Sequence, residues 1–207
     1  MMDWDQLLLP YKQAVDELKV KLKGLRGQYE KCGLTPPIEF VTGRVKPITS
    51  IMDKARRKNI DFMTIEQELQ DLAAIRIMVP FVDDILRVVQ LLKDRNDFEI
   101  VEEQDYILHS KKSGYRSYHM VILYPVQTVN GEKKVFAEIQ IRTLAMNFWS
   151  TIEHSLNYKH KGKFPNEMKE RLQKVAEAVY CLDEEMSKIR KEICEAQIVF
   201  SNKITDE

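Results

Sequence analysis

The chain contains 207 residues, in which 32 lysines and arginines balance 32 aspartates and glutamates, so the formal net charge at neutral pH is zero. This balance excludes a strong overall field toward nucleic acids or anionic membranes, and any basic binding site must be local. No apolar run approaches the ~20 residues that span a bilayer, and no basic segment precedes the short Leu7–Leu9 run. We expect one cytoplasmic domain over residues 1–207, without a membrane partner, because domains commonly contain ~100–200 residues.

Several common catalytic signatures are missing from the sequence. The cysteines Cys32, Cys181 and Cys194 have neither CxxC nor metal-ligand spacing, which is typical of free thiols in a reducing compartment. There is no GxxxxGKS/T phosphate loop, no GxGxxG fingerprint, no GxSxG elbow and no His-Asp dipeptide. The sequence therefore gives no support for the chemistries that depend on these motifs.

A long amphipathic helix is predicted at the N-terminus, over residues 1–31. Asp3 can cap it, and Gln6 can complete a capping box. Apolar and aromatic residues then recur over Trp4–Tyr29 at alternating spacings of four and three. Pro10 lies within this series and predicts a local break or a later start of the helix.

The middle of the chain, residues 36–160, alternates predicted strands and helices. The last two strands are joined by a turn that contains Asn130-Gly131, a strong hairpin signal. Long connections combined with one hairpin predict an α+β fold, a mixed sheet of about five strands flanked by helices. The predicted strands are residues 38–46, 72–79, 98–106, 115–123 and 136–142, and the predicted helices are residues 47–58, 83–95 and 144–158.

A second long helix is predicted at the C-terminus, over residues 165–202. Its apolar stripe extends from Met168 to Phe200. The two terminal helices could pack on each other or on the sheet, or the stripe could form an interface between copies of the chain, and the sequence favours neither alternative.

The last two strands carry an unusual set of polar side chains. Period-two spacing places the polar side chains of each strand on a single face. A solvated edge face is one explanation, and a site for a polyanion and a base is the other. The residues are Glu138, Gln140 and Arg142 on one strand and Tyr115, Ser117 and His119 on its partner.

Two carboxylates and a group of cations extend this hypothesis. Asp71 precedes a strand and Glu138 lies within another, and together they could hold Mg²⁺, which accepts one or two carboxylates besides water and phosphate oxygens. Taken alone, Asp71 is better explained as a residue of a helix-to-strand turn. The cations that could bind a polyphosphate, or simply be solvated, are Arg44, Lys46, Lys54, Arg56, Arg57 and Lys58.

The loop over residues 108–114 is cationic and precedes Tyr115. Lys111 could contact a phosphate while the Tyr115 ring stacks on a base, an interaction of ~1–3 kcal/mol. A surface loop and, for His119, a buried structural histidine are the alternatives.

Four blocks of the sequence resemble one known family, the RelA/SpoT homologues, and within it the RelQ-type small alarmone synthetases. The resemblance covers nearly the whole chain, and several long ordered blocks are more specific than any one motif. The blocks are PIEFVTGRVKP (37–47), QDLAAIRIM (70–78), SGYRSYH (113–119) and EIQIRTLAMNFWSTIEHSLNYK (138–159).

The resemblance implies a nucleotidyltransferase-like fold and a reaction. The β,γ-pyrophosphate of ATP would be transferred to the 3′-hydroxyl of GDP or GTP, giving ppGpp or pppGpp and AMP, with Mg²⁺ as cofactor and no hydrolase activity. It also implies a homotetramer built through the terminal helices, with (p)ppGpp as an allosteric ligand.

The resemblance further implies residue roles. Glu138 would be the general base, and Asp71 and Glu138 the Mg²⁺ carboxylates, while Arg44 and Arg76 would sandwich the adenine. The implied sets are Arg44, Lys46, Ser50, Lys54, Arg57 and Arg76 for ATP, Lys111, Tyr115, His119 and Gln140 for GDP or GTP, and Lys19, Lys23, Phe40, Thr42 and Asn147 for the allosteric ligand.

Two other functions fit the same residues. One is a catalytically silent regulator that binds nucleotide or single-stranded RNA, and the other is a terminal nucleotidyltransferase, which the neutral overall charge disfavours. Ala74 also departs from the family, which often has glycine there, and its methyl group could crowd a bound nucleotide.

Overall fold

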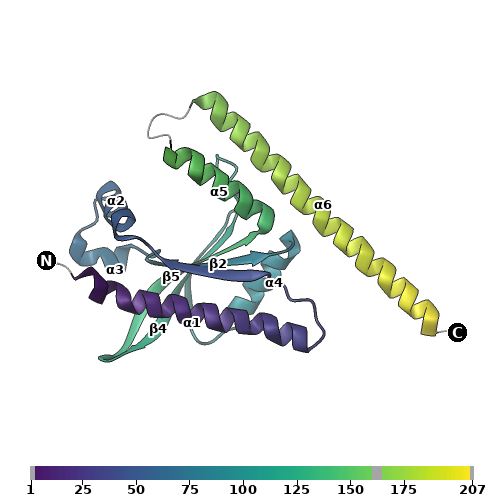
Figure 1. The fold of residues 1–207 in the computed structure, drawn as a ribbon, viewed down its shortest axis with the longest axis horizontal. Coiled ribbons are helices and arrows are strands. Elements are labelled where there is room, and N and C mark those ends of the chain that lie inside the picture. The colour runs from purple at the N-terminus through teal and green to yellow at the C-terminus, as the bar shows by residue number, and fades with distance from the viewer. Residues whose placement is uncertain (1–2, 160–164, 206–207) are drawn as a thin grey trace.

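The computed structural model describes residues 3–159 and 165–205. A five-stranded mixed sheet with strand order β1-β2-β5-β4-β3 lies between helices (Figure 1), as the sequence predicted. The strands are β1 (Phe40–Val45), β2 (Ala73–Val79), β3 (Glu99–Asp105), β4 (Tyr118–Thr128) and β5 (Gly131–Thr143); the helices are α1 (Trp4–Lys31), α2 (Ile48–Lys58), the 3₁₀ turn η1 (Phe62–Thr64), α3 (Ile65–Glu68), α4 (Val82–Lys93), α5 (Leu144–Lys159) and α6 (Asn166–Thr205).

The two faces of the sheet differ in chemistry. Alternate residues such as Ile75, Ile139 and Met120 are fully buried in one continuous core with side chains of α1 and α4. The opposite face carries charged and amide side chains, and α5 lies on that side of the sheet (Figure 1). A sheet that buries only one face reads as alternating apolar and polar residues, which is the pattern that the sequence showed.

Helix α1 begins where the sequence predicted. The Asp3 carboxylate accepts hydrogen bonds from the backbone N–H groups of Asp5 and Gln6, at 3.1 and 3.2 Å. The predicted break at Pro10 is wrong, because the helix continues through this residue. Pro10 removes one backbone hydrogen bond, but Tyr11, Leu18 and other residues along the same stripe are buried against the sheet, and this packing holds the helix on both sides of the proline.

The strands of the β4–β5 hairpin extend closer to the turn than predicted, and β4 begins later than predicted. Its strands pair up to Thr128 and Gly131, on either side of the predicted turn. The prediction that β4 begins at Tyr115 is wrong, since the strand begins at Tyr118. Arg116 explains the difference: its guanidinium donates to the Ile107 carbonyl at 2.7 Å and to Glu177 of α6 at 3.1 Å, so this stretch is held by a loop and a helix rather than by a neighbouring strand.

Helix α6 packs on α5 through apolar side chains such as Ala176, which is 5% exposed, and is also held on α4 and β5 by polar side chains. Arg190 pairs with the buried Asp84 at 2.7 Å, and the backbone N–H of Val82 donates to the Ser187 hydroxyl at 3.2 Å. The Thr143 hydroxyl donates to Asp183, which is 7% exposed. Polar anchors of this kind fix one orientation of the helix.

The apolar stripe of α6 stays largely uncovered. Five apolar side chains of the stripe are 40–55% exposed: Val175, Leu182, Met186, Ile189 and Ile193. The stripe therefore does not serve packing within the chain, whereas α1 does pack on the sheet. The side chain of Phe200 lies outside the described residues. Among the helices described, none is both long and apolar enough to cross a membrane.

We expect Gly43→Ala to destabilise the protein. An added Cβ would lie 2.7 Å from Ile75 Cδ1 and 2.8 Å from Val15 Cγ1, where α1 crosses β1, and both side chains are buried. Overpacking of this kind lowers the free energy of unfolding by about 1–3 kcal/mol, which urea denaturation would measure. Gly27→Ala is the control, because nothing lies within 4 Å of its added Cβ. It should stabilise α1 by about 0.5–1 kcal/mol. Unchanged stability of Gly43→Ala would contradict this account.

Candidate functional site

The polar face is organised by the strand register. Across β1, β2 and β5, Arg44 pairs with Ala74 and Ala74 with Glu138, while one pleat further on Thr42 pairs with Arg76 and Arg76 with Gln140. His119 of β4 is the next partner of Gln140. Residues that are far apart in the chain thus form two adjacent rows on one side of the sheet. Ala74 lies between Arg44 and Glu138, which is where a larger side chain would crowd the site.

Asp71 binds two lysines. It precedes β2, and its Oδ2 lies 2.8 Å from Lys46 Nζ, just after β1, and 2.7 Å from Lys54 Nζ on α2. Burial opposes ionisation of Asp71, but the two ammonium groups outweigh burial and hold the pKa of the carboxyl below its usual value. Asp71 is therefore a carboxylate at neutral pH.

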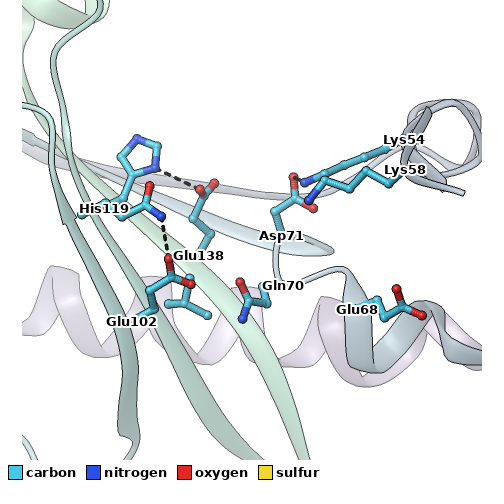
Figure 2. A pocket seen from close by; sticks show the side chains of 10 residues that line it. Lys54, Lys58, Glu68, Gln70, Asp71, Glu102, His119 and Glu138 are labelled. Carbon is cyan, nitrogen blue, oxygen red and sulfur yellow. Dashed lines mark hydrogen bonds and ion pairs between the residues drawn. The ribbon is translucent and has the colours of Figure 1, made fainter. Parts of the chain in front are cut away.

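Asp71 and Glu138 line the same cavity, of about 270 Å³. Figure 2 shows Lys54 and Lys58 on the Asp71 side of this cavity and His119 beside Glu138. The negative charge of Asp71 opposes ionisation of Glu138, as expected of neighbouring carboxylates, although the pKa of Glu138 stays below its usual value. The structure thus brings together the two acidic residues that the sequence analysis paired.

Both oxygens of Glu138 accept hydrogen bonds from neighbouring side chains. Oε1 lies 3.0 Å from Nδ1 of His119, and Oε2 accepts from Nε2 of Gln140 at 2.6 Å. Burial raises the pKa of Glu138, but the contacts with His119 and Gln140 outweigh it and lower the pKa below its usual value. Glu138 is thus a fixed, ionised carboxylate.

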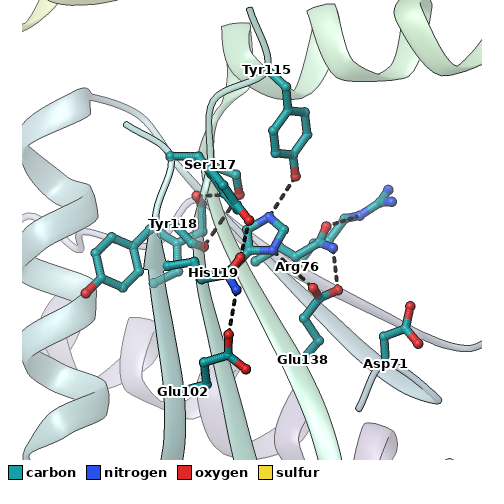
Figure 3. A network of polar contacts seen from close by, with 12 residues as sticks. Asp71, Arg76, Glu102, Tyr115, Ser117, Tyr118, His119 and Glu138 are labelled. Atoms are coloured by element: carbon teal, nitrogen blue, oxygen red, sulfur yellow. Dashed lines mark hydrogen bonds and ion pairs between the residues drawn. The ribbon is translucent and has the colours of Figure 1, made fainter. Parts of the chain in front are cut away.

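Two of the predicted GDP or GTP residues, Tyr115 and His119, lie on the β4 side of Glu138 (Figure 3). The Tyr115 hydroxyl is 2.7 Å from Nε2 of His119, although Tyr115 precedes the strand. Lys111 Nζ lies 5.1 Å from the centre of the Tyr115 ring and 4.4 Å from that of Tyr106. With Gln140 next to His119, all four residues of this set are close together.

The predicted ATP residues surround a second cavity on the β1 side, of about 650 Å³. Arg76 lies on the neighbouring strand, and burial together with the charges of Arg142 and Arg44 lowers its pKa. Lys54 lines the Asp71 cavity instead and, with Lys46, connects the two cavities through Asp71. The second cavity is lined by Arg44, Lys46, Pro47, Ser50, Asp53, Arg56, Arg57 and His154.

The residues at the first cavity are suited to Mg²⁺. Asp71 Oδ1 is buried and has no hydrogen-bond partner, so a carboxylate oxygen is free to bind a cation. Mg²⁺ accepts one or two carboxylates and completes its octahedron with water and phosphate oxygens. Within residues 3–159 and 165–205 no group of three or more His, Cys, Asp and Glu side chains could hold a metal. The pair Asp71 and Glu138 would therefore bind Mg²⁺ together with a phosphate ligand.

The five residues predicted to bind an allosteric ligand lie on three elements, α1, β1 and α5. They line none of the cavities described above. Phe40 and Thr42 are exposed on the edge strand β1, whereas Asn147 is on α5. Lys19 and Lys23 are on α1, and Lys19 pairs weakly with Asp16 at 3.5 Å. Their common role stays a prediction.

Arg142 received no role in the sequence analysis. The side chain is 3% exposed and donates to the hydroxyls of Ser117 and Ser150, at 3.2 and 3.0 Å, and to Tyr115 and Gln140. Its period-two spacing from Glu138 and Gln140 placed it on the polar face, but only the structure shows that it is buried and central there.

The fold and the charges of its polar face define a nucleotidyltransferase-like α+β protein. Residues 43–163 match the region found in RelA/SpoT proteins, and the chain belongs to this family. It is 61% identical over 200 residues to the GTP pyrophosphokinase YjbM of Bacillus subtilis (strain 168), with 97% of this chain and 94% of the relative covered.

Two solved structures are similar over almost the whole chain. The crystal structure of small alarmone synthetase 1 from Bacillus subtilis bound to its product pppGpp has a TM-score of 0.88 and 61% identity, and covers 92% of this chain and 97% of that one. The structure of the same synthetase bound to AMPCPP has a TM-score of 0.82 and 57% identity, and covers 93% of this chain and 98% of that one.

The Asp71 cluster should make stability depend on pH. The folded-state pKa of Asp71 is lowered, so the stabilisation is present above the unfolded value of about 3.9 and is lost as pH falls through the folded pKa. Urea unfolding at a series of acidic pH values should therefore show a steeper loss of free energy in the wild type than in Asp71→Asn. Asp16→Asn is the control, because the Asp16 side chain is 61% exposed. Equal slopes for the wild type and Asp71→Asn would contradict the ion-pair account.

Proposed function

We propose that the chain is a GTP pyrophosphokinase, which transfers the β,γ-pyrophosphate of ATP to the 3′-hydroxyl of GDP or GTP and releases (p)ppGpp and AMP. The observation that carries this proposal is the position of Glu138, in a cavity shared with Asp71, between a cationic pocket on the β1 side and an aromatic cluster on the β4 side. A relative at 61% identity bears the same activity in its name.

ATP would occupy the β1 side. Arg44 and Arg76 are adjacent cations on neighbouring strands, and planar guanidinium groups stack well on an adenine ring. Lys46, Lys54 and Arg57 would contact the phosphates, and Ser50 at the start of α2 would donate a hydrogen bond. When Lys46 and Lys54 contact the phosphates, their contacts with Asp71 would weaken, and the Asp71 carboxylate would become available to Mg²⁺.

The acceptor nucleotide would occupy the β4 side, with its base on the Tyr115 ring and a phosphate near Lys111. Glu138 would accept the proton of the 3′-hydroxyl. The hydroxyl oxygen then forms a bond to the β-phosphorus of ATP, the bond from that phosphorus to the α,β-bridging oxygen breaks, and AMP leaves. A carboxylate already ionised at neutral pH and held by two hydrogen bonds suits this role.

The remaining contribution is electrostatic. Asp71 and Glu138 would hold Mg²⁺, and the ion would supply neutralisation of charge on the transferred group. The lysines and arginines add to this effect, and positioning of the two nucleotides supplies the rest. No covalent enzyme intermediate is needed.

Incubation with ATP, GDP and Mg²⁺ should give ppGpp and AMP, which separation of the products would identify. Removal of divalent cations with EDTA should abolish the reaction, and added Mg²⁺ should restore it. Formation of ADP would overturn the assignment of the reaction, and tight nucleotide binding without turnover would favour the silent regulator.

Glu138→Gln should lower kcat by about 10²–10⁴-fold, since general base catalysis typically contributes this much. The variant should keep its fold, because the amide is close in size to the carboxylate, and circular dichroism and thermal unfolding would verify this. Glu132→Gln, on an exposed part of the same strand, is the matched control and should keep wild-type activity. Near-normal turnover by Glu138→Gln would exclude Glu138 as the base.

We further propose that the chain forms a homotetramer through its terminal helices and that (p)ppGpp binds between subunits. The uncovered stripe of α6 supports the first part. The exposed side chains of Phe40 and Thr42 on the edge strand β1, and of Lys23 on α1, support the second.

Light scattering should give the mass of four chains. A Leu182→Glu and Met186→Glu double variant should dissociate, because it places two carboxylates in an apolar interface. The Glu192→Gln variant, on the exposed surface of the same helix, should remain assembled. A monomeric wild-type protein would rule out the helix interface.

A further inference from the structure

The most unusual side chain outside the proposed chemistry is Arg142. It is 3% exposed, yet among the described residues no carboxylate lies within ion-pair distance of its guanidinium. Taking a cation out of water without an anionic partner costs several kcal/mol. A neutral side chain would be expected here if the position served packing alone.

The guanidinium is held in one orientation by its own acceptors. Nε donates to the Ser117 hydroxyl at 3.2 Å, and Nη1 donates to the Ser150 hydroxyl of α5 at 3.0 Å. These two contacts leave Nη2 directed at two further acceptors, the Tyr115 hydroxyl at 2.5 Å and Gln140 Oε1 at 2.7 Å.

Each of these acceptors passes a hydrogen bond on to a different oxygen of Glu138. Along one chain, the Tyr115 hydroxyl contacts Nε2 of His119, and Nδ1 of His119 contacts Oε1 of Glu138. Along the other chain, Nε2 of Gln140 donates to Oε2 of Glu138. Figure 3 shows both chains ending on the one carboxylate.

The direction of both chains follows from their arginine donors, because a guanidinium can only donate. Gln140 turns its carbonyl oxygen toward Arg142 and also toward Arg76, whose Nε donates to the same oxygen at 3.2 Å, and this leaves its NH₂ group for Glu138. The Tyr115 oxygen accepts from Arg142, which leaves the Tyr115 proton to be donated to Nε2 of His119. Nδ1 of His119 carries the proton that reaches Glu138, because a carboxylate can only accept. Without the Arg142 guanidinium the Tyr115 hydroxyl could reverse, and Arg76 alone would hold the Gln140 amide.

We propose that Arg142 is a positioning residue, which directs the chain through Tyr115 and His119 and, together with Arg76, the chain through Gln140, and thereby holds the Glu138 carboxylate in the orientation that accepts the 3′-hydroxyl proton. The inference rests on the proposed role of Glu138 as the base. Arg142 itself contacts neither the reacting atoms nor the cavity that Asp71 and Glu138 share.

The test is a double-mutant cycle of Arg142→Gln and Glu138→Asp, with kcat and the KM for ATP measured in each variant. Arg142→Gln should lower kcat by about 100-fold, the cost typical of a catalytic group misplaced by about 1 Å, with little change in the KM for ATP. In Glu138→Asp the shortened carboxylate can no longer meet both donors. Adding Arg142→Gln to this variant should therefore lower kcat by only a few-fold more. Arg142→Lys keeps a buried donor and should recover part of the loss.

Binding measurements separate positioning from damage to the fold. Arg142→Gln should bind AMPCPP, which is a non-reactive ATP analogue, at the same stoichiometry and similar affinity as the wild type. Arg95→Gln is the control, because Arg95 is a half-buried arginine that pairs with Asp97 far from the site. It should lower stability without lowering kcat. If Arg142→Gln does not fold, Ser150→Ala can replace it in the cycle, because it removes one acceptor of the guanidinium. Ser150→Ala should lower kcat several-fold when Glu138 is present and by less in the Glu138→Asp variant.

Three results would overturn the proposal: independent losses in the two variants, a raised KM for GDP with unchanged kcat, or a reduced AMPCPP stoichiometry that accounts for the lost activity. Failure of the proposed function would look different, since the wild type would then form no ppGpp, or Glu138→Gln would be as active as the wild type.

Discussion

The parallel pairing of β2 with β5 is the constraint on which the site depends. This register sets Ala74 beside Glu138 and Arg76 beside Gln140, which are 64 residues apart in the chain. Parallel strands need a long crossover connection, and here it includes α4, β3 and β4. The same crossover delivers β4 to the other edge of β5. Glu138 is thereby enclosed between the arginines of β1 and β2 on one side and His119 on the other.

The two carboxylates of the cavity are stabilised in different ways, and the difference suits different roles. Asp71 is held by two lysines, whose ammonium groups can move to a polyphosphate when one binds, and its second oxygen has no partner. Glu138 is held by His119 and Gln140, which are themselves oriented by arginines, Arg142 through Tyr115 and Arg142 with Arg76 at Gln140. One carboxylate can therefore exchange its partners, whereas the other stays fixed. A metal ligand benefits from the first property and a general base from the second.

Helix α6 reverses the usual arrangement of an amphipathic helix. Its inward side is anchored by polar contacts, including that of Asp183 with Thr143, the residue that follows Arg142. Its apolar stripe faces outward. The helix that would join subunits is thus attached to the strand that carries Glu138. Helix α6 also holds the segment that carries Tyr115 and Arg116, because the Arg116 guanidinium lies 3.8 Å from the centre of the Tyr180 ring.

Periodicity and turn chemistry in the sequence were enough to predict the mixed sheet, the polar face with Glu138 and Gln140, and the cap at Asp3, because these depend on neighbouring residues. The effect of Pro10, the start of β4 and the burial of Arg142 could not be predicted in this way. A helix continues through a proline when tertiary packing outweighs one lost hydrogen bond, and Arg116 leaves the strand because its partners lie on a loop and on α6. The sequence alone determined which side chains share a face. The tertiary structure decided which are buried and what they contact, because burial and long-range hydrogen bonds exist only once distant segments have packed together.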